Sequence, residues 1–363
     1  MRYKFDDIAY NITQKRAPQK EDSLKYIGLE HLDSGSITVN RYGLDVDLKG
    51  DKLVMKKGDI LLGKRNAYLR RAAIAPHDGL FSAHGMVLRP KEDVIYKDYF
   101  PFFISSDRFF DELIRISVGG LSPTVNWRDL KELEFELPSL DQQKVLAEKL
   151  WAAYDVKQSY LRMIAATEEM VKSQFIEMFE DKGYPLAMIK SFADVTTGGT
   201  PSKAHPEYWN GDKLWVSAED MKSKYLYDTC EKVTDAGYAT CKIIPVDTLM
   251  YVCRGSIGVM AINKLECATN QSICRATCHD NVCNVEFLYH ALMFQRDNIK
   301  KMGTGTSFKS LNQTTFSELE IKLPPYVEQM KFVAIAEQAD KSEFELRKSI
   351  EAIDAVIKSL INS

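Results

Sequence analysis

The sequence predicts a mixed α/β (α+β) protein in which one domain occurs twice and a long helix follows each copy. The segment Leu137–Gln143 returns 186 positions later as Leu323–Gln329, and the same spacing relates Asn126 to Asn312. Within each copy, short apolar runs alternate with Gly and Pro, and after each copy the apolar residues change to a helical period. A repeat of this length is far longer than one solenoid unit, so we expect two pseudo-symmetric domains.

Short apolar runs between turn residues indicate the strands of each copy. In the first copy these runs are Lys52–Met55, Asp59–Leu62, Ala72–Ala75 and Met86–Leu88, and in the second copy they are Thr248–Cys253 and Val259–Ile262. A single helix is expected over Tyr99–Ile116 in the first copy and over Val285–Met302 in the second, because glycines follow both segments.

Two long helices are indicated by residues that step alternately by four and three positions. The first ladder is Leu146, Leu150, Ala153, Lys157, Tyr160, Ile164, Thr167 and Val171, and the second is Phe332, Ala336, Ala339, Glu343, Leu346, Ile350, Ile353, Ile357 and Leu360. This heptad spacing places each ladder on one narrow face of a helix. We therefore expect helices over Gln143–Phe179 and Gln329–Ile361 that pair antiparallel as a coiled coil, with the two α/β units at opposite ends. The alternative is that each helix packs only on its own domain.

These patterns predict four parts. A first α/β domain covers residues 1–137, a central helix covers 138–183, a second α/β domain covers 184–323, and a C-terminal helix covers 324–363. Pro138 and Pro324 stand at the expected helix starts, where proline is tolerated.

The composition is that of an ordinary globular protein, with 45% hydrophobic and 27% charged residues and a formal net charge of −3. No apolar run approaches the roughly 20 residues of a membrane span, and the N-terminal segment lacks the apolar core of a secretory signal. All seven cysteines lie in the second half, at Cys230, Cys241, Cys253, Cys267, Cys274, Cys278 and Cys283. An odd number confined to one copy favours reduced thiols over a disulfide framework, so we expect a cytoplasmic protein.

A basic segment is the main local departure from this balance. Lys52–Arg71 holds seven basic residues and one acidic residue, Asp59. Such a segment is either an ordinary solvated face or a surface that follows a phosphate backbone.

Several segments carry a resemblance to one family. They are Thr197–Ser202, Glu207–Asp212 with Leu214–Ser217, Gly58–Leu62 with Lys64 and Arg65, Arg254–Gly258, Asn270 with Gln271, Leu311 with Asn312, and the twice-occurring helix start with Leu-Pro and Gln. In their order and duplication, these segments resemble the specificity subunit of Type I restriction–modification enzymes.

The resemblance implies a role as well as a fold. Two target recognition domains would each read one half of a split DNA site, and two antiparallel helices would set the gap between the halves. Two methyltransferase subunits would dock on the helices, and motor-nuclease subunits are further candidate partners. The chain itself would perform no chemistry and bind no cofactor, because S-adenosylmethionine belongs to the methyltransferase subunits.

The two copies differ where target reading is expected. Asn66–Tyr68 stands where the second copy has Gly255–Ile257, and Trp127 stands where it has Gln313. We therefore expect two different targets and an asymmetric bipartite DNA site.

The candidate DNA contacts are basic or polar residues in loops. They are Lys64, Arg65, Arg70, Arg71, His84, Ser122, Thr124, Asn126, Arg254, Ser256, Asn270, Gln271, Thr306, Ser307, Lys309, Asn312 and Gln313. Arginine can pair with guanine, and Asn or Gln with adenine, while Ser, Thr and Lys suit phosphates. The same polar side chains also stabilise ordinary turns, and that alternative stays open.

Other functions have weaker support. Leu323–Tyr326 resembles a methyltransferase motif, but Leu323 lacks the polar side chain needed at its first position. The group Cys274, Cys278, His279 and Cys283 lacks the usual zinc spacing, so no metal site is predicted. A nuclease has little support, because the duplicated positions show no pair of acidic residues with a nearby lysine. The remaining alternative is a stand-alone DNA-binding or scaffold protein without methyltransferase partners; a partner-bearing helix pair should instead expose Leu161, Met163, Met170, Phe175 and Phe179.

Overall fold

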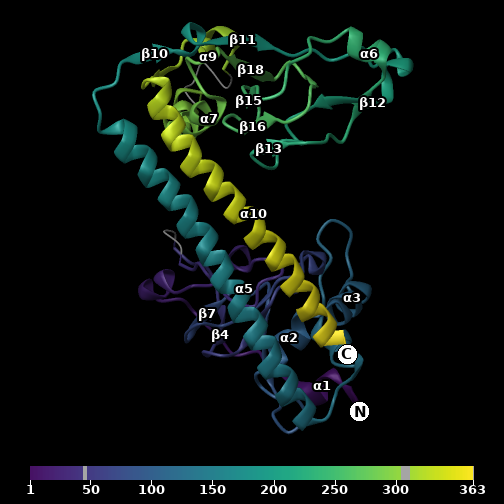
Figure 1. Cartoon of the computed structure of the whole chain (residues 1–363). Helices are drawn as coiled ribbons and strands as arrows, with labels where there is room; N and C mark the ends of the chain where they lie inside the picture. The colour runs from purple at the N-terminus through teal and green to yellow at the C-terminus, as the bar shows by residue number, and fades with distance from the viewer. Residues whose placement is uncertain (44–46, 304–310, 363) are drawn as a thin grey trace. The chain divides into compact units, whose positions relative to one another are not determined.

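The computed structural model describes residues 1–43, 47–303 and 311–362. The chain forms two compact units (Figure 1). The first unit contains Met1–Leu161 and the residues from Arg347 onward, and the second contains Arg162–Leu346. Each unit combines sheets with helices, which confirms the predicted fold class. The domain boundaries inferred from the sequence stay a prediction.

The first unit begins with short strands and helices around two small sheets. Its elements are β1 (Arg2–Lys4), α1 (Phe5–Ile8), β2 (Ala9–Ile12), β3 (Lys15–Arg16), β4 (Lys52–Met55), β5 (Ile60–Leu62), β6 (Ala72–Ile74), β7 (Gly79–Phe81), β8 (Met86–Pro90), α2 (Phe100–Ser105), α3 (Asp107–Arg115), α4 (Trp127–Leu130) and β9 (Glu134–Glu136). One sheet has the order β2-β8-β5-β6, another has the order β3-β4-β7, and β1 pairs with β9.

The second unit repeats this plan with additions. Its elements are β10 (Leu186–Met188), β11 (Ala193–Thr197), β12 (Trp209–Val216), β13 (Tyr225–Leu226), β14 (Lys232–Val233), α6 (Asp235–Ala239), β15 (Leu249–Val252), β16 (Met260–Asn263), β17 (Ala268–Thr269), β18 (Ile273–Cys278), α7 (Val285–Phe294), α8 (Arg296–Gly303), α9 (Gln313–Ser317) and β19 (Glu320–Lys322). The order β11-β18-β15-β16-β13 matches the first sheet with one strand added, β14-β12-β17 forms another sheet, and β10 pairs with β19.

The central strand of each large sheet is buried on both faces, as its unbroken apolar sequence requires. All residues of β5 and of β15 are buried. Each lies between two antiparallel neighbours: β6 and β8 flank β5, and β16 and β18 flank β15. The six strands expected from apolar runs are present as β4, β5, β6, β8, β15 and β16.

The helix expected after the strands is wrong in both copies, because two short helices replace it. In the first unit, Ser106 adopts extended backbone between α2 and α3. Its hydroxyl donates to the carbonyl oxygen of Phe103 at 2.7 Å and accepts from the amide of Phe109 at 3.1 Å. Serine at this position thus ends one helix and caps the next. In the second unit, the break falls at Gln295, between α7 and α8.

Two long helices account for the heptad ladders (Figure 1). Helix α5 covers Leu140–Phe175 and continues as a π-turn over Ile176–Glu180, and α10 covers Tyr326–Asn362. No helix in the described part of the chain is long and apolar enough to cross a membrane.

The two helices run antiparallel. In the first unit, Leu146 of α5 and Ile361 of α10 line the same pocket. Lys157, which comes later in α5, forms a 2.6 Å ion pair with Asp354, which comes earlier in α10. As α5 advances, its partners in α10 therefore come from earlier positions. In the second unit the later part of α5 meets the early part of α10, where the ring of Phe332 lies 5.3 Å from the ring of Phe175. That the two α/β units stand at opposite ends of the pair stays a prediction.

Every ladder residue of both helices is buried or half-buried. Leu161, Met163 and Met170, which are off the ladder, are 40–53% exposed, as expected. Phe175 and Phe179, however, were expected to be exposed and are only 3% and 1% exposed. The last residue of α5 is Phe175, and the π-turn contains Phe179; both lie in the core of the second unit, where they pack against other aromatic rings.

A buried glutamine fixes the start of each long helix. Gln143 is fully buried in the first turn of α5. Its side-chain oxygen accepts from the amide of Tyr96 at 2.7 Å, and its side-chain nitrogen donates to the carbonyl oxygens of Val94 and Pro138 at 3.1 and 3.0 Å. These bonds join the helix to the chain segment between β8 and α2.

The second unit repeats this arrangement bond for bond. Gln329 is fully buried. Its oxygen accepts from the amide of Asn284 at 2.9 Å, and its nitrogen donates to the carbonyl oxygens of Val282 and Pro324, both at 2.9 Å. The repeated Leu-Pro and Gln motif therefore encodes a clamp between an α/β domain and its helix.

Replacing either clamp residue by alanine should destabilise the unit that contains it. Gln143→Ala and Gln329→Ala each leave one backbone amide and two carbonyl groups without their hydrogen-bond partner. This loss should lower the free energy of unfolding by about 2–4 kcal/mol. Urea unfolding measures the loss. Lys149→Ala, an exposed change on the same α5 helix, is the control and should change stability by less than about 0.5 kcal/mol. Equal stabilities of all three variants would show that the clamp is unimportant.

Candidate nucleic-acid interface

In the first unit, the loop after β5 lies against the segment before α4. The amide of Val125 donates to the carbonyl oxygen of Lys64 at 2.9 Å, and the amide of Asn66 donates to that of Pro123 at 2.7 Å. Arg65 and Thr124 form an isolated antiparallel bridge. These backbone bonds bring together Lys64, Arg65, Ser122, Thr124 and Asn126, five of the residues predicted to contact DNA.

The second unit joins the equivalent loops by one corresponding backbone bond and by one further bond. The amide of Leu311 donates to the carbonyl oxygen of Cys253 at 2.9 Å, which places Arg254 and Asn312 on neighbouring segments. The amide of Cys253 also donates to the carbonyl oxygen of Ser272 at 2.8 Å, which brings the turn at Asn270 and Gln271 close to them. In each unit, several of the residues predicted to contact DNA therefore lie on neighbouring loops.

Two arginines in these surfaces are available to a ligand. Arg65 and Arg254 are both exposed, as is Ser256 beside Arg254. Among the described residues, neither guanidinium group has an ion-pair partner. Lys64 is half-buried, and burial, together with the nearby charge of Lys15, lowers the pKa of its amine. A guanidinium keeps its charge in such surroundings, which suits both phosphate and guanine.

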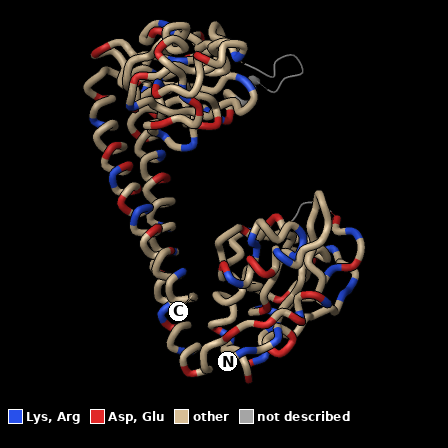
Figure 2. Tube along the Cα trace, turned by 90° about the vertical axis from the view of Figure 1, so that its right-hand side faces the viewer, with Lys and Arg blue, Asp and Glu red and all other residues tan. Residues whose placement is uncertain are grey.

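Other basic residues of the Lys52–Arg71 segment are engaged within the protein. Arg70 forms ion pairs with Asp107 and with Asp111, the latter at 2.6 Å. Arg71 donates to the carbonyl oxygen of Leu29 at 3.3 Å. Acidic residues that are distant in the sequence therefore neutralise part of the positive charge of Lys52–Arg71. Figure 2 shows basic and acidic residues interspersed on both units. Contact of Arg70 or Arg71 with DNA stays a prediction.

Several predicted polar contacts also hold turns. The side-chain oxygen of Asn270 accepts from the amide and the hydroxyl of Ser272, and that of Gln271 accepts from the hydroxyl of Thr200 at 2.6 Å. Asn312 caps α9 through the amide of Thr315 at 2.9 Å. These side chains stabilise the loop conformations, whether or not they also contact DNA.

The remaining candidates differ between the copies. Gln313 donates to the carbonyl oxygen of Val195 at 2.9 Å. Asn126, the counterpart of Asn312, is exposed and its side chain does not cap α4. His84 is exposed between β7 and β8. The predicted contacts Thr306, Ser307 and Lys309 lie outside the described residues.

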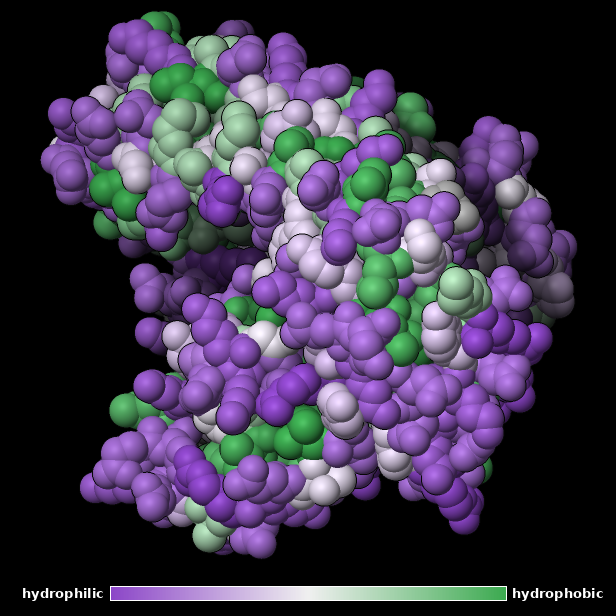
Figure 3. Space-filling view, turned by 90° about the horizontal axis from the view of Figure 1, so that it is seen from below, coloured by the Kyte–Doolittle hydropathy of each residue, from purple (hydrophilic) through white to green (hydrophobic). Residues whose placement is uncertain are grey.

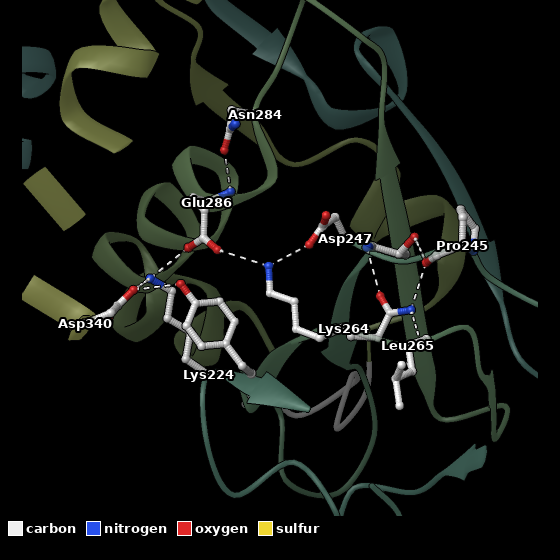
Figure 4. A network of polar contacts seen from close by, with 11 residues as sticks. Lys224, Pro245, Asp247, Lys264, Leu265, Asn284, Glu286 and Asp340 are labelled. Carbon is white, nitrogen blue, oxygen red and sulfur yellow. Dashed lines mark hydrogen bonds and ion pairs between the residues drawn. The ribbon is translucent and has the colours of Figure 1, made fainter. Parts of the chain in front are cut away.

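A polar network joins the sheet of the second unit to α10 (Figure 4). Lys224 forms ion pairs with Glu286 at 2.8 Å and with Asp340 at 2.6 Å. The hydroxyl of Tyr225 donates to Asp340 at 2.7 Å. Glu286 is 5% exposed, so removal of the lysine would leave a buried carboxylate without its closest cation.

The network also contains Lys264 and His290. Lys264 lies 3.8 Å from Glu286 and 2.6 Å from Asp247. His290 lies 3.2 Å from the Lys224 amine. Burial, with the charge of Lys224, lowers the pKa of His290 to about 3, so its ring is neutral at physiological pH.

The first unit uses a neutral contact at the corresponding place. Asp340 lies 186 positions after Tyr154, whose hydroxyl is hydrogen-bonded to the Thr38 hydroxyl at 2.9 Å. Sequence reasoning missed the network, because its members are far apart in the chain and have no counterpart in the first copy. The clamp had a usable sequence signal, because Gln143 and Gln329 recur at the repeat spacing of 186 residues.

No metal centre emerges from the described residues: none of their His, Cys, Asp and Glu side chains form a group of three or more that could hold a metal ion. The seven cysteines are free thiols.

Comparison with known proteins identifies the family of the chain. A family profile described as "Type I restriction modification DNA specificity domain" matches residues 2–158 and again residues 184–354. The chain therefore belongs to the Type I restriction–modification DNA specificity family, and the family domain occurs in it twice.

The chain is similar to named specificity subunits. It is 28% identical over 189 residues to the Type I restriction enzyme MjaIX specificity subunit of Methanocaldococcus jannaschii, a match that covers 50% of this chain and 44% of that protein. It is 27% identical over 191 residues to the HindI specificity subunit of Haemophilus influenzae, covering 50% and 41%. These matches span less than half of either relative. A putative MjaX specificity subunit of M. jannaschii is 21% identical over 381 residues, covering 95% of this chain and 88% of that protein.

Two solved structures have a similar fold over nearly the whole chain. The S subunit of a Type I restriction–modification system from M. genitalium has a TM-score of 0.61 at 14% identity and covers 99% of this chain and 94% of that chain. A chain from a study of complex assembly and conformational transition of the type I R-M system has a TM-score of 0.57 at 16% identity, covering 100% and 96%.

Loss of either free arginine should weaken DNA binding. If Arg254 contacts a base, Arg254→Ala should lower the free-energy preference for that base by about 1–3 kcal/mol. If it contacts phosphate, affinity should fall for all sequences and the salt slope should shrink by about one unit. The same alternatives apply to Arg65→Ala. Fluorescence anisotropy at several salt concentrations separates them, with Lys149→Ala as control. Binding equal to that of the unchanged protein in both variants would remove these loops from the interface.

Proposed function

We propose that this chain is the DNA sequence-specificity subunit of a Type I restriction–modification complex, and that each unit reads one half of a bipartite, asymmetric site. The observation that carries the proposal is the repeated loop surface. One backbone bond of this surface recurs: Val125 donates to Lys64 in the first unit as Leu311 donates to Cys253 in the second, and an exposed arginine, Arg65 or Arg254, follows each acceptor. After the arginines the two loops differ, with Asn66–Tyr68 in one and Gly255–Ile257 in the other, which suits one scaffold that reads two sequences.

The long helices fit the role of a spacer. They contain 36 and 37 residues, which corresponds to a length of about 55 Å at roughly 1.5 Å per residue. A buried glutamine and one further polar or ionic contact tie α5 to the first α/β domain and α10 to the second. The length of the helices should therefore set the gap between the two half-sites.

The partners in this proposal are two methyltransferase subunits, with motor-nuclease subunits as a further addition. Apolar side chains off the ladders support a docking surface on the helices: Met163 is 53% exposed, Phe344 is 66% exposed and Val356 is 51% exposed. Large exposed apolar side chains of this kind commonly mark protein interaction sites.

In this proposal the chain performs no catalysis, and S-adenosylmethionine is bound by the methyltransferase subunits in the cytoplasm. The segment that resembles a methyltransferase motif supports this. Leu323 donates its amide to the carbonyl oxygen of Pro185 at 3.0 Å and packs against the core, so the segment serves as the entry to α10. Methyl transfer also requires a pocket for a flipped base, which the partner would supply.

Sequencing of modified adenines in the source genome tests the proposed function. We expect one methylated motif with two unlike specific parts separated by a fixed unspecified gap, and loss of this modification when the gene is deleted. A methylation pattern that is unaffected by the deletion would overturn the proposal.

Shortening both helices by one heptad should shorten the recognised gap. Deletion of Tyr160–Ala166 together with Leu346–Ala352 keeps the ladders in phase and removes roughly 10 Å of helix. At about 3.4 Å per base pair, the gap should shrink by about three base pairs while both half-site sequences stay the same.

The readout is the methylated motif of the complex, because the accompanying twist can lower affinity without changing specificity. Deletion of a heptad from only one helix is the control, since it mismatches the pair and should reduce activity. A folded, active double-deletion protein that methylates sites with the original gap would show that the helices do not set the spacing.

A further inference from the structure

A positively charged side chain lies deep inside the second unit. Hydrophilic residues predominate on the face that Figure 3 shows, but Arg275 of β18 is only 1% exposed. Among the described residues, no other lysine or arginine is buried to this extent, and no carboxylate forms an ion pair with Arg275. Burial lowers the pKa of its guanidinium group, yet arginine stays charged in proteins. A buried charge without a counterion is costly, so its other contacts should show what it does.

The register of the large sheet places Arg275 between two neighbouring strands. Across the ladders it pairs with Met250 of β15 and with Thr196 of β11. Paired residues project from the same face of a sheet, and Met250 packs in an apolar cluster with Leu214 and Val216 of β12. The side chain of Arg275 therefore extends into the interior that the β14-β12-β17 sheet covers.

The guanidinium group joins two backbone segments. One terminal nitrogen donates to the carbonyl oxygen of Lys242 at 2.6 Å, and the other donates to that of Thr197 at 2.7 Å. Thr197 is the last residue of β11, so the second bond holds the point at which the chain leaves the sheet. The planar guanidinium suits this bridge because its donors have a fixed geometry.

The loop that begins after Thr197 is pressed against the turn after β17. A Cβ atom on Gly198 would overlap the carbonyl oxygen of Thr269, so glycine is required for this close approach. The amide of Gly199 donates to the same oxygen at 2.9 Å. The hydroxyl of Thr200 then donates to the side-chain oxygen of Gln271 at 2.6 Å. The bonds that start at Arg275 therefore reach a residue predicted to contact DNA.

The first unit has no arginine at the corresponding place. Val87 of β8 pairs with Leu61, the second residue of β5, as Arg275 pairs with Met250, the second residue of β15. Val87 is fully buried in an apolar cluster that includes Leu61. An apolar side chain is therefore sufficient for the sheet at this position, which indicates that the arginine serves the loop and not the sheet.

We propose that Arg275 is a positioning residue for target reading in the second unit: it fixes the end of β11, so that the loop of residues 198–202 holds the turn with Asn270 and Gln271 in its reading conformation. The inference rests on the proposed function, because it takes this turn to read DNA. Arg275 is too deeply buried to contact DNA itself. Its loss should therefore change base discrimination in one half-site and leave the general attraction to phosphates intact.

Hydrogen exchange of the full-length protein without DNA tests the positioning itself. Arg275→Met removes both donors but keeps a long side chain, whereas Arg275→Lys keeps the charge without the planar fork. The amide of Gly199 should exchange at least about tenfold faster in Arg275→Met, because the loop opens more often once its hydrogen bond to the arginine is lost. Arg275→Lys should give an intermediate rate.

Met250→Ala is the matched control for the exchange experiment. It removes buried apolar atoms beside Arg275 and should lower the Tm, but it takes no hydrogen bond from the loop. The Gly199 amide should therefore exchange at the rate of the unchanged protein. An unchanged rate in Arg275→Met, or an equal acceleration in Met250→Ala, would overturn the positioning role. If Arg275→Met does not fold, the same comparison is made with Arg275→Lys.

The second test measures base discrimination in the assembled complex. Single-base changes are made in each half of the methylated motif, and the methylation rates are compared. Arg275→Met should lower discrimination by about fivefold or more in one half only. Gly198→Ala, which displaces the same loop without altering Arg275, should lower it in the same half, and Met250→Ala should leave it unchanged.

The two tests separate the inference from the proposed function. Loss of discrimination in both halves, or full discrimination by Arg275→Met in spite of faster exchange, would contradict the reading role of the loop. If the complex of the unchanged chain shows no bipartite motif at all, the proposed function fails instead. The exchange experiment is independent of that result, because it uses no DNA and no partner.

Discussion

The architecture depends on a buried glutamine at the start of each long helix. An amide side chain can donate and accept at once, so Gln143 and Gln329 each satisfy three backbone groups that would otherwise be buried without partners. The clamp fixes both where the helix begins and which face it turns toward its domain. The ladder of each helix takes its position from that start, and the two ladders recur at the same spacing of 186 residues as the two glutamines.

Around this shared frame the two units use different chemistry. The second unit joins its sheet to α10 through Lys224, Glu286 and Asp340, while at the corresponding position of α5 the first unit has a neutral hydrogen bond between Tyr154 and Thr38. A buried ionic network is costly to desolvate and strongly destabilising when one member is removed. The loop surfaces also differ, because Asn66–Tyr68 follows Arg65 in the first unit where Gly255–Ile257 follows Arg254 in the second.

The sequence was sufficient for the features that rest on periodicity or repetition. The duplication, the strands around β5 and β15 and the two ladders all depend on short-range pattern, and the structure contains them. The single helix expected over Tyr99–Ile116 was wrong, because the local hydrogen bonds of Ser106 break a segment whose apolar pattern is continuous. The burial of Phe179 and the pairing of Arg70 with acidic residues of α3 depend on tertiary contacts that single-sequence patterns do not report. Residues that hold a turn could not be told from residues that face a ligand, as Asn312 shows.

The most direct test of the account is to make the two recognition domains identical. Residues 184–323 would be replaced by a second copy of residues 1–137, with Asp340→Tyr so that α10 offers the contact that Tyr154 makes with Thr38 in the first unit. The modified motif of the resulting complex is then read by sequencing methylated adenines. If each unit reads one half-site on a shared frame, the motif becomes an inverted repeat of the first half-site with the original gap. A folded, active protein that still methylates an asymmetric site would contradict the account.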